Sequence, residues 1–259
     1  MKTIIVASDL SHRSRPALSR AVDLAISADA RLFVIHVVNE DLPADLSYPV
    51  QVGAKTIISE QVAEDAAGRA LDHEVRVVVG DPIAEIGEAV VSFKADLLIV
   101  GQHRRRKFLD QIRETTMEHL VRSSEVPVLL VTKAADQPYG HVLCGTALSG
   151  VCTAAVKTIP LVARQPHLEL FHAHEVSFSK EARQDYETWK SRYPLPNDLP
   201  DPKFVEASAR DALDDILSKD SYDLLAIGGH TRTIGGRYVL GKFTADLIRN
   251  PPCDLLIGK

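Results

Sequence analysis

The sequence predicts an α/β fold of two tandem domains, each with a doubly wound, five-stranded parallel sheet. Short β-branched runs alternate with segments of helical periodicity, and the whole pattern restarts near residue 140. Buried strands separated by helices are typical of parallel sheets that are covered on both faces. The length of 259 residues suits one large domain or two domains of about 130 residues each.

The first half shows this alternation most clearly. Its apolar runs predict strands at residues 3–7, 31–38, 75–79, 96–100 and 126–131. Helical spacing predicts a helix capped by Ser11, a second from about Lys55 to Ala70, and a third starting at Pro82. A fourth helix is expected in the later part of 104–123, and Pro43 and Pro49 assign the residues before the second helix to a loop.

The second half repeats the first. The segment Asp96–His103 matches Asp223–His230 at an offset of 127, and Ser11 falls against Ser149 at an offset of 138. We therefore expect homologous domains at 1–133 and 140–259, joined by a linker. The second domain carries a polar insert at 178–203, followed by a short or irregular third strand.

Composition excludes several functional classes. A net charge of −5 is the opposite of what binding to nucleic acid or to an anionic membrane usually requires. No apolar stretch is long enough to span a bilayer, and the apolar run before Asp9 is too short for a signal peptide. Three cysteines without C-x-x-C spacing fit a reduced, cytoplasmic protein.

Candidate ligand-binding residues follow the ends of the expected strands. Ligands of open parallel sheets bind outside the carboxyl ends of the strands, where the strand order reverses. In the first half these positions are Asp9, the residues Val37 to Asn39, and the loop Gly101 to Lys107. A carboxylate there can accept hydrogen bonds from a ribose or a base, and a glycine-containing loop can hold phosphate.

The chain resembles a tandem member of the universal stress protein (UspA) family. The resemblance covers nearly the whole chain, because the same motifs occur twice in the same order. In the first half it rests on the segments Ile4–Ser11, Val34–Val38, Gly80–Pro82, Asp96–His103 and Val126–Val131.

This resemblance implies an adenine-nucleotide site in the first domain. In the nucleotide-binding branch, the Asp after strand one and the Val after the strand-two His hold adenosine, and G-x-x-G-x₉-G-(S/T) wraps the triphosphate. The first half departs from that pattern at Arg104 and Glu114, where glycines are expected. The site residues implied here are Ala7, Asp9, Val37, Gly101, His103, Arg104, Thr115 and Thr116.

The second domain departs from the pattern differently. It keeps Gly228 and Gly241, but Lys242 replaces the Ser or Thr, and Ala147 stands where Asp9 would. Ala173 replaces Val37. Neither half therefore has a complete motif, and the implied cofactor is ATP or AMP with Mg²⁺, or none.

Structural interpretations stay open beside these. Asp9 can be a turn residue, Thr115 and Thr116 can be helix caps, and the basic run from Arg104 can be a solvated loop. His36 and His172 are expected to be packed, and no metal site is assigned, although His172, His174 and His230 leave zinc as an alternative. The aromatic residues of the insert can close a core or bind a ligand; these are Tyr186, Trp189 and Tyr193.

We expect a regulatory rather than an efficient catalytic protein, because no nucleophile–base pair is visible. The main expectation is a stress-response regulator or interaction module with degenerate sites. One alternative is nucleotide binding in the first domain, with at most slow hydrolysis, and another is a carrier of a different small ligand in the second domain. The resemblance also implies strand order 3-2-1-4-5 and pairing of Val126–Val131 with Cys253–Ile257, which makes an intramolecular pseudo-dimer. A homodimer and an unknown protein partner remain possible, without nucleic acid or membrane.

Overall fold

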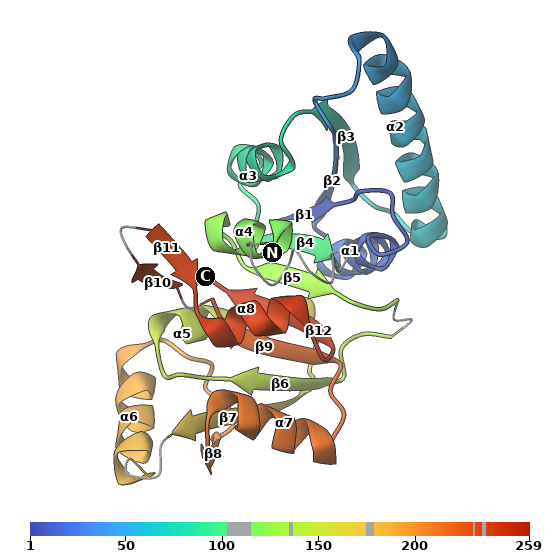
Figure 1. Ribbon diagram of the computed structural model, residues 1–259. Coiled ribbons are helices and arrows are strands. Elements are labelled where there is room, and N and C mark those ends of the chain that lie inside the picture. Colours follow the sequence, from blue (N-terminus) through green and yellow to red (C-terminus); the bar gives the residue numbers. More distant parts are fainter. Residues whose placement is uncertain (103–114, 135–136, 175–178, 230, 235–236) are drawn as a thin grey trace. The chain divides into compact units, whose positions relative to one another are not determined.

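The computed structural model describes residues 1–102, 115–134, 137–174, 179–229, 231–234 and 237–259 (Figure 1). The chain forms two compact units, unit 1 (Met1–Asp136) and unit 2 (Gln137–Lys259). Each unit has a parallel sheet with helices on both faces, which confirms the predicted fold class.

Unit 1 contains five parallel strands in the order β3-β2-β1-β4-β5, as expected. The strands are β1 (Thr3–Ala7), β2 (Arg31–Val38), β3 (His73–Val79), β4 (Leu97–Gly101) and β5 (Val128–Val131). The helices are α1 (Arg15–Ala28), α2 (Ala44–Ala66), α3 (Pro82–Ser92) and α4 (Thr116–Ser123). Figure 1 shows α2 and α3 on opposite sides of β2 and β3.

The central strand β1 is the place where the strand order reverses. It pairs with β2 on one side and with β4 on the other, and Ile4, Ile5 and Val6 are fully buried. The carboxyl ends of β1, β2 and β4 therefore meet at one edge of the sheet, which positions the candidate site.

Two predicted helix boundaries in unit 1 are wrong. Helix α1 has Ser14, not Ser11, at its N-cap, because the carbonyl of Ser11 accepts the N–H groups of Ser14 and Arg15 in a preceding turn. Helix α2 begins at Ala44 rather than near residue 55 and contains Pro49. A proline this close to the helix start removes only one backbone hydrogen bond, so it does not exclude the helix.

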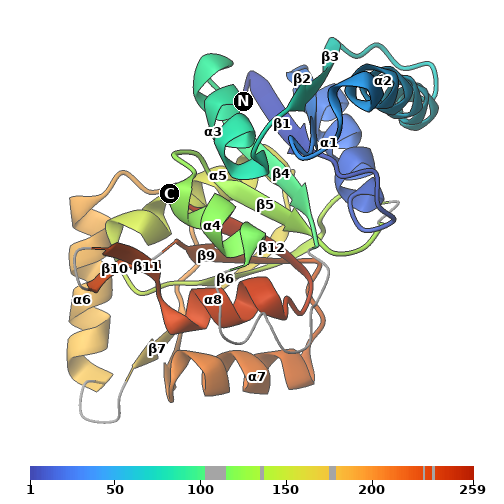
Figure 2. The ribbon, with the colours of Figure 1, turned by 45° about the horizontal axis from the view of Figure 1, so that its top comes forward.

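Unit 2 repeats this architecture in the strand order β8-β7-β6-β9-β12. Its strands are β6 (His141–Gly145), β7 (His167–His174), β8 (Lys203–Glu206), β9 (Leu224–Gly228) and β12 (Asp254–Gly258). Its helices are α5 (Gly150–Val162), α6 (Ser179–Arg192), α7 (Ala209–Lys219) and α8 (Lys242–Arg249). Figure 2 shows α7 and α8 together on one side of the unit.

Unit 2 also departs from unit 1. Strand β8 has only four residues, in line with the expected short third strand. The polar insert forms α6, and the strands β10 (Thr231–Ile234) and β11 (Arg237–Leu240) form an antiparallel hairpin that the sequence did not predict.

Matched hydrogen bonds explain why some residues repeat. A side-chain oxygen of Asp96 accepts the N–H groups of Lys2 and Thr3, and a side-chain oxygen of Asp223 accepts those of Gly140 and His141. Each aspartate thus fastens the start of the central strand to the neighbouring strand. These repeated aspartates serve the fold.

The two repeated histidines are also structural. Nδ1 of His36 donates to the carbonyl of Ser8 over 2.7 Å, and Nδ1 of His172 donates to the carbonyl of Thr146 over 2.8 Å. Both bonds hold the turn after the central strand, which supports the expectation that these histidines are packed.

Among the described residues, no helix combines the length and apolar character that crossing a bilayer requires.

Candidate functional site

A cavity of about 240 Å³ opens in unit 1 at the carboxyl ends of β1, β2 and β4. Five of the residues singled out from the sequence line it: Ala7, Asp9, Val37, Gly101 and Thr116. They come from three strands and from the start of α4, so folding brings together residues that are far apart in the chain.

Sequence reasoning missed much of the cavity wall. The additional lining residues are Ser8, Ser14, Ile35, Pro82, Ile86, Gln102, Met117 and Leu120. The apolar face of α3 was recognisable from its helical spacing, but nothing in the pattern indicated that Ile86 faces a cavity. With these residues, the lining combines apolar side chains with the polar side chains of Ser8, Asp9, Ser14, Gln102 and Thr116.

Asp9 supplies a negative charge to this lining. The N–H of Ser11 donates to its carboxylate over 2.9 Å. Partial burial tends to raise the pKa of Asp9, but hydrogen bonds from the Ser11 and Ser14 hydroxyls and from the Ser11 N–H lower it below its ordinary value of 3.8. The carboxylate is therefore ionised at neutral pH and can accept hydrogen bonds from a ligand.

Gly101 permits close packing beside the cavity. A Cβ atom at this position would lie 2.4 Å from the carbonyl oxygen of Arg13 and 2.7 Å from Cα of Ser14. Both are backbone atoms that cannot move aside cheaply, so β4 and the turn before α1 require a glycine here. The matching position of unit 2 is also a glycine, Gly228, where an added Cβ atom would lie 2.9 Å from the backbone nitrogen of Cys152.

The start of α4 is held by a capping box. The Thr115 hydroxyl accepts the N–H of Glu118 over 3.2 Å, and the Glu118 carboxylate accepts the N–H of Thr115 over 2.7 Å. Thr115 is thus a helix cap and does not line the cavity. Thr116 and Met117 line it instead, and their N–H groups have no acceptor within the helix.

Two predicted site residues, His103 and Arg104, lie outside the described residues, as do Glu114 and the basic run 104–107.

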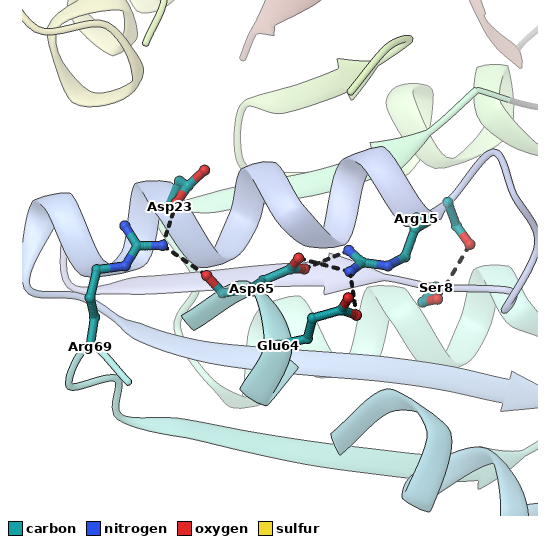
Figure 3. A network of polar contacts seen from close by, with 7 residues as sticks. Ser8, Arg15, Asp23, Glu64, Asp65 and Arg69 are labelled. Carbon is teal, nitrogen blue, oxygen red and sulfur yellow. Dashed lines mark hydrogen bonds and ion pairs between the residues drawn. The ribbon is translucent and has the colours of Figure 1, made fainter. Parts of the chain in front are cut away.

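A polar network braces the helix that follows Asp9. Arg15 on α1 contacts Asp65 on α2 over 2.5 Å and Glu64 over 3.3 Å, and Arg69 contacts Asp23 over 2.8 Å. Figure 3 shows these contacts along α1, together with the hydrogen bond between the hydroxyls of Ser8 and Ser14. The network ties α1, which follows the cavity residue Ser14 directly in the chain, to α2.

The matching place in unit 2 is built from different side chains. Ala147 follows the central strand, so no carboxylate stands where Asp9 does. The buried Cys152 occupies the position of Ser14, and its sulfur accepts the N–H of Ala147 over 3.2 Å. A Cβ atom at Gly228 would lie 3.0 Å from that sulfur. This turn of unit 2 packs closely on β9, as the turn of unit 1 does on β4.

The aromatic residues of α6 cover the start of α5. The indole N–H of Trp189 donates to the Ser149 carbonyl and to the Thr153 hydroxyl, both over 3.0 Å. Trp189 and Tyr186 are each 2% exposed. These aromatic residues therefore close a core, which was one of the two open interpretations.

The remaining predicted residues of unit 2 lie at the start of α8. Gly241 is its N-cap and Lys242 its first residue, and no side chain caps this helix. Within the described residues, no group of three or more His, Cys, Asp and Glu could hold a metal ion, and His230 lies outside them.

Comparisons with known proteins agree with this architecture. A universal stress protein of Mycobacterium tuberculosis is 29% identical over 140 residues, covering 53% of this chain and 51% of that protein. Universal stress protein A homolog 1 of Coxiella burnetii is 33% identical over 118 residues, covering 39% of this chain and 76% of that protein. The chain spans about half the length of the first of these relatives.

A solved structure matches nearly the whole fold. A universal stress protein from Archaeoglobus fulgidus superposes with a TM-score of 0.76 at 17% identity, covering 99% of this chain and 98% of that one. The profile of the Universal stress protein family matches residues 1–132. The chain belongs to the universal stress protein family.

Proposed function

We propose that unit 1 binds an adenine nucleoside or nucleotide, such as AMP or ATP with Mg²⁺, and that this binding serves a stress-response regulator. One observation carries the proposal: five residues singled out from the sequence line one cavity, and the ionised carboxylate of Asp9 is among them.

The chemistry of the cavity suits the nucleoside part of such a ligand. Asp9 can accept hydrogen bonds from ribose hydroxyls, while the side chains of Val37, Ile86 and Met117 offer apolar surface to a base. A volume of about 240 Å³ lies somewhat below the range of about 300–1,000 Å³ typical of small-molecule sites. It therefore suits a nucleoside better than a whole triphosphate.

Phosphate groups would extend toward the start of α4. The N–H groups of the first helical turn attract anions, and Thr116 lies at both the helix start and the cavity. Mg²⁺ usually binds through substrate phosphates together with one or two carboxylates. Since no nucleophile–base pair is recognisable in the sequence, we propose at most slow hydrolysis.

A second candidate role belongs to unit 2. Because Ala147 replaces the carboxylate and Cys152 and Trp189 pack around the start of α5, we propose an interaction or bracing role there. We also propose that the protein acts in the cytoplasm, because Cys144, Cys152 and Cys253 are all free thiols.

Isothermal titration with adenosine, 2′-deoxyadenosine, AMP and ATP tests the proposal, with Mg²⁺ present and absent. Asp9→Ala should weaken adenosine binding by about 1.5–3 kcal/mol, the usual contribution of a hydrogen bond to a charged group. Asp41→Ala is a matched control, because Asp41 is an exposed carboxylate that does not line the cavity.

The pattern of outcomes separates the alternatives. If Asp9 accepts a ribose hydroxyl, Asp9→Ala should also reduce the preference for adenosine over its 2′-deoxy form. Absence of heat with every nucleotide would overturn nucleotide binding and leave the interaction role alone. Binding that Asp9→Ala leaves unchanged would place the ligand elsewhere.

A further inference from the structure

Helix α2 of unit 1 is buried only along its later turns. Its buried side chains recur every four residues, at Ala54, Ile58, Val62 and Ala66. None of the side chains at 45–53 is buried. In Figure 1 the first turns of α2 reach past the strands of unit 1, whereas the later turns lie alongside β3.

The unburied part of α2 is apolar. Leu46 is 50% exposed, Tyr48 74%, Val50 42% and Val52 48%. With Ile57, they make up five of the eight large hydrophobic residues that are exposed in the described part of the chain. No charged residue stands between Asp45 and Lys55. An apolar surface gathered on one element in this way marks an interaction site.

One side of this helix segment has a self-complementary pattern. Asp45, Tyr48, Val52 and Lys55 follow one another at spacings of three, four and three residues, so they share one side of the helix. The stripe has opposite charges at its ends and apolar residues between them. Read in the reverse direction, it matches itself with the charges exchanged.

We propose that this stripe is the interface of a homodimer in which α2 of two chains pack antiparallel. In that arrangement Asp45 lies opposite Lys55 of the partner subunit, and Tyr48 lies opposite Val52 of the partner subunit. Two-fold symmetry repeats each contact, as a closed dimer interface requires. When the partner is a second copy, each charged residue of the stripe thus faces an opposite charge, and each apolar residue faces an apolar residue.

Charge complementarity favours a second copy over another protein. Neither Asp45 nor Lys55 forms an ion pair with any other described residue of its own chain, so both charges are available to a partner. A single helix pair buries less than the roughly 1,200–2,000 Å² of stable interfaces, so the dimer is reversible and depends on protein concentration.

Sedimentation velocity of the full chain over a wide concentration range tests the dimer. D45K or K55D alone should raise the dissociation constant at least about tenfold, because like charges then face each other. The double variant D45K/K55D should restore dimerisation, because it exchanges the charges without changing the pattern. V52D should abolish the dimer, whereas V91D, which places the same charge on an exposed valine of α3, should leave it intact.

Thermal unfolding serves as the folding control, because none of the four stripe residues is buried. A chain that stays monomeric at every concentration would overturn the proposal. So would a dimer that V52D leaves intact, or one that the double charge exchange fails to restore. Failure of nucleotide binding would not affect it, because the stripe does not line the cavity.

Discussion

The same helix contact is made by charges in unit 1 and by an aromatic ring in unit 2. At an offset of 138 residues, Arg15 on α1 corresponds to Thr153 on α5. Arg15 binds the carboxylate of Asp65 on α2, whereas Thr153 accepts the indole N–H of Trp189 on α6. One position therefore joins the helix after the central strand to the next helix in both units, by different chemistry.

The turns after the two central strands show which parts can change. Leu10 and Leu148 both adopt the left-handed conformation, at φ values of 60° and 52°. Ser8 and Thr146 use their side-chain oxygens to accept the N–H groups of these leucines. The turn is thus kept, while the residue between differs: Asp9 in unit 1 and Ala147 in unit 2. The leucine and the hydroxyl residue that build the turn are therefore kept in both units, whereas the residue between them, which is available to a ligand, differs.

The largest effect should come from breaking the two helix contacts. Trp189→Ala removes a ring that is 2% exposed, so it should destabilise unit 2 by about 3–5 kcal/mol. Arg15→Ala removes a bidentate ion pair with Asp65, whose side chain is only 11% exposed, so it should cost about 1.5–3 kcal/mol, less than Trp189→Ala. Urea unfolding measures both.

Trp189→Phe separates packing from hydrogen bonding. It keeps most of the ring and loses the indole N–H, so it should cost clearly less than Trp189→Ala. Equal costs for Trp189→Ala and Arg15→Ala would contradict the view that unit 2 depends on an aromatic core where unit 1 uses charges.

An intermediate effect is expected at the glycines that end β4 and β9. A Cβ atom added at Gly101 would lie 2.4 Å from the nearest backbone atom, whereas one added at Gly228 would lie 2.9 Å from it. Gly101→Ala should therefore destabilise by about 1–3 kcal/mol, the range for overpacking, and by more than Gly228→Ala. Thermal unfolding of both variants tests the order.

Gly87→Ala is the control for these substitutions. Gly87 lies in α3 with no atom within 4 Å of an added Cβ, so alanine should stabilise the helix by up to about 1 kcal/mol. A larger loss at Gly228 than at Gly101 would show that the turn of unit 1 relaxes more easily than its geometry indicates.

The smallest expected effect is a change in the pH dependence of stability at Glu169. The Lys203 ammonium hydrogen-bonds the Glu169 carboxylate and lowers its pKa below the ordinary 4.5, against a smaller effect of burial. Because the folded pKa is the lower one, the stability from this pair is complete above about pH 4.5 and is lost as pH falls through the folded pKa. Since Lys203 is 57% exposed, Glu169→Gln should cost at most about 1 kcal/mol at pH 7.

The contribution of Asp9 to the stability of unit 1 should depend on pH with the same sign. Its pKa is also lowered, so Asp9→Asn should lose its effect on stability at acid pH as well. Urea unfolding at pH 7 and pH 3 compares the two variants with the wild type. A difference between Glu169→Gln and the wild type that grows as pH falls would contradict the assignment.

The fold was predictable because its signals are local or repeated. Buried strands of parallel sheets are apolar runs, and the second copy confirmed the spacing of the first. Predictions failed where a residue typical of one local structure occurs in another. Ser11 was expected to cap a helix but belongs to a turn, and Pro49 was expected in a loop but lies within α2. The hairpin of β10 and β11 left no pattern that distinguished it from a loop.

The sequence alone determined most of the strands, their repeated order and the residues at the strand ends, since these depend on period and order along the chain. Only the tertiary structure decided which of those residues share a cavity. It brought Asp9, Val37 and Thr116 together, assigned Thr115 to a cap, and buried Trp189 against α5. The physical reason is that a cavity and a core both depend on contacts between residues far apart in sequence, and a linear pattern does not contain those distances.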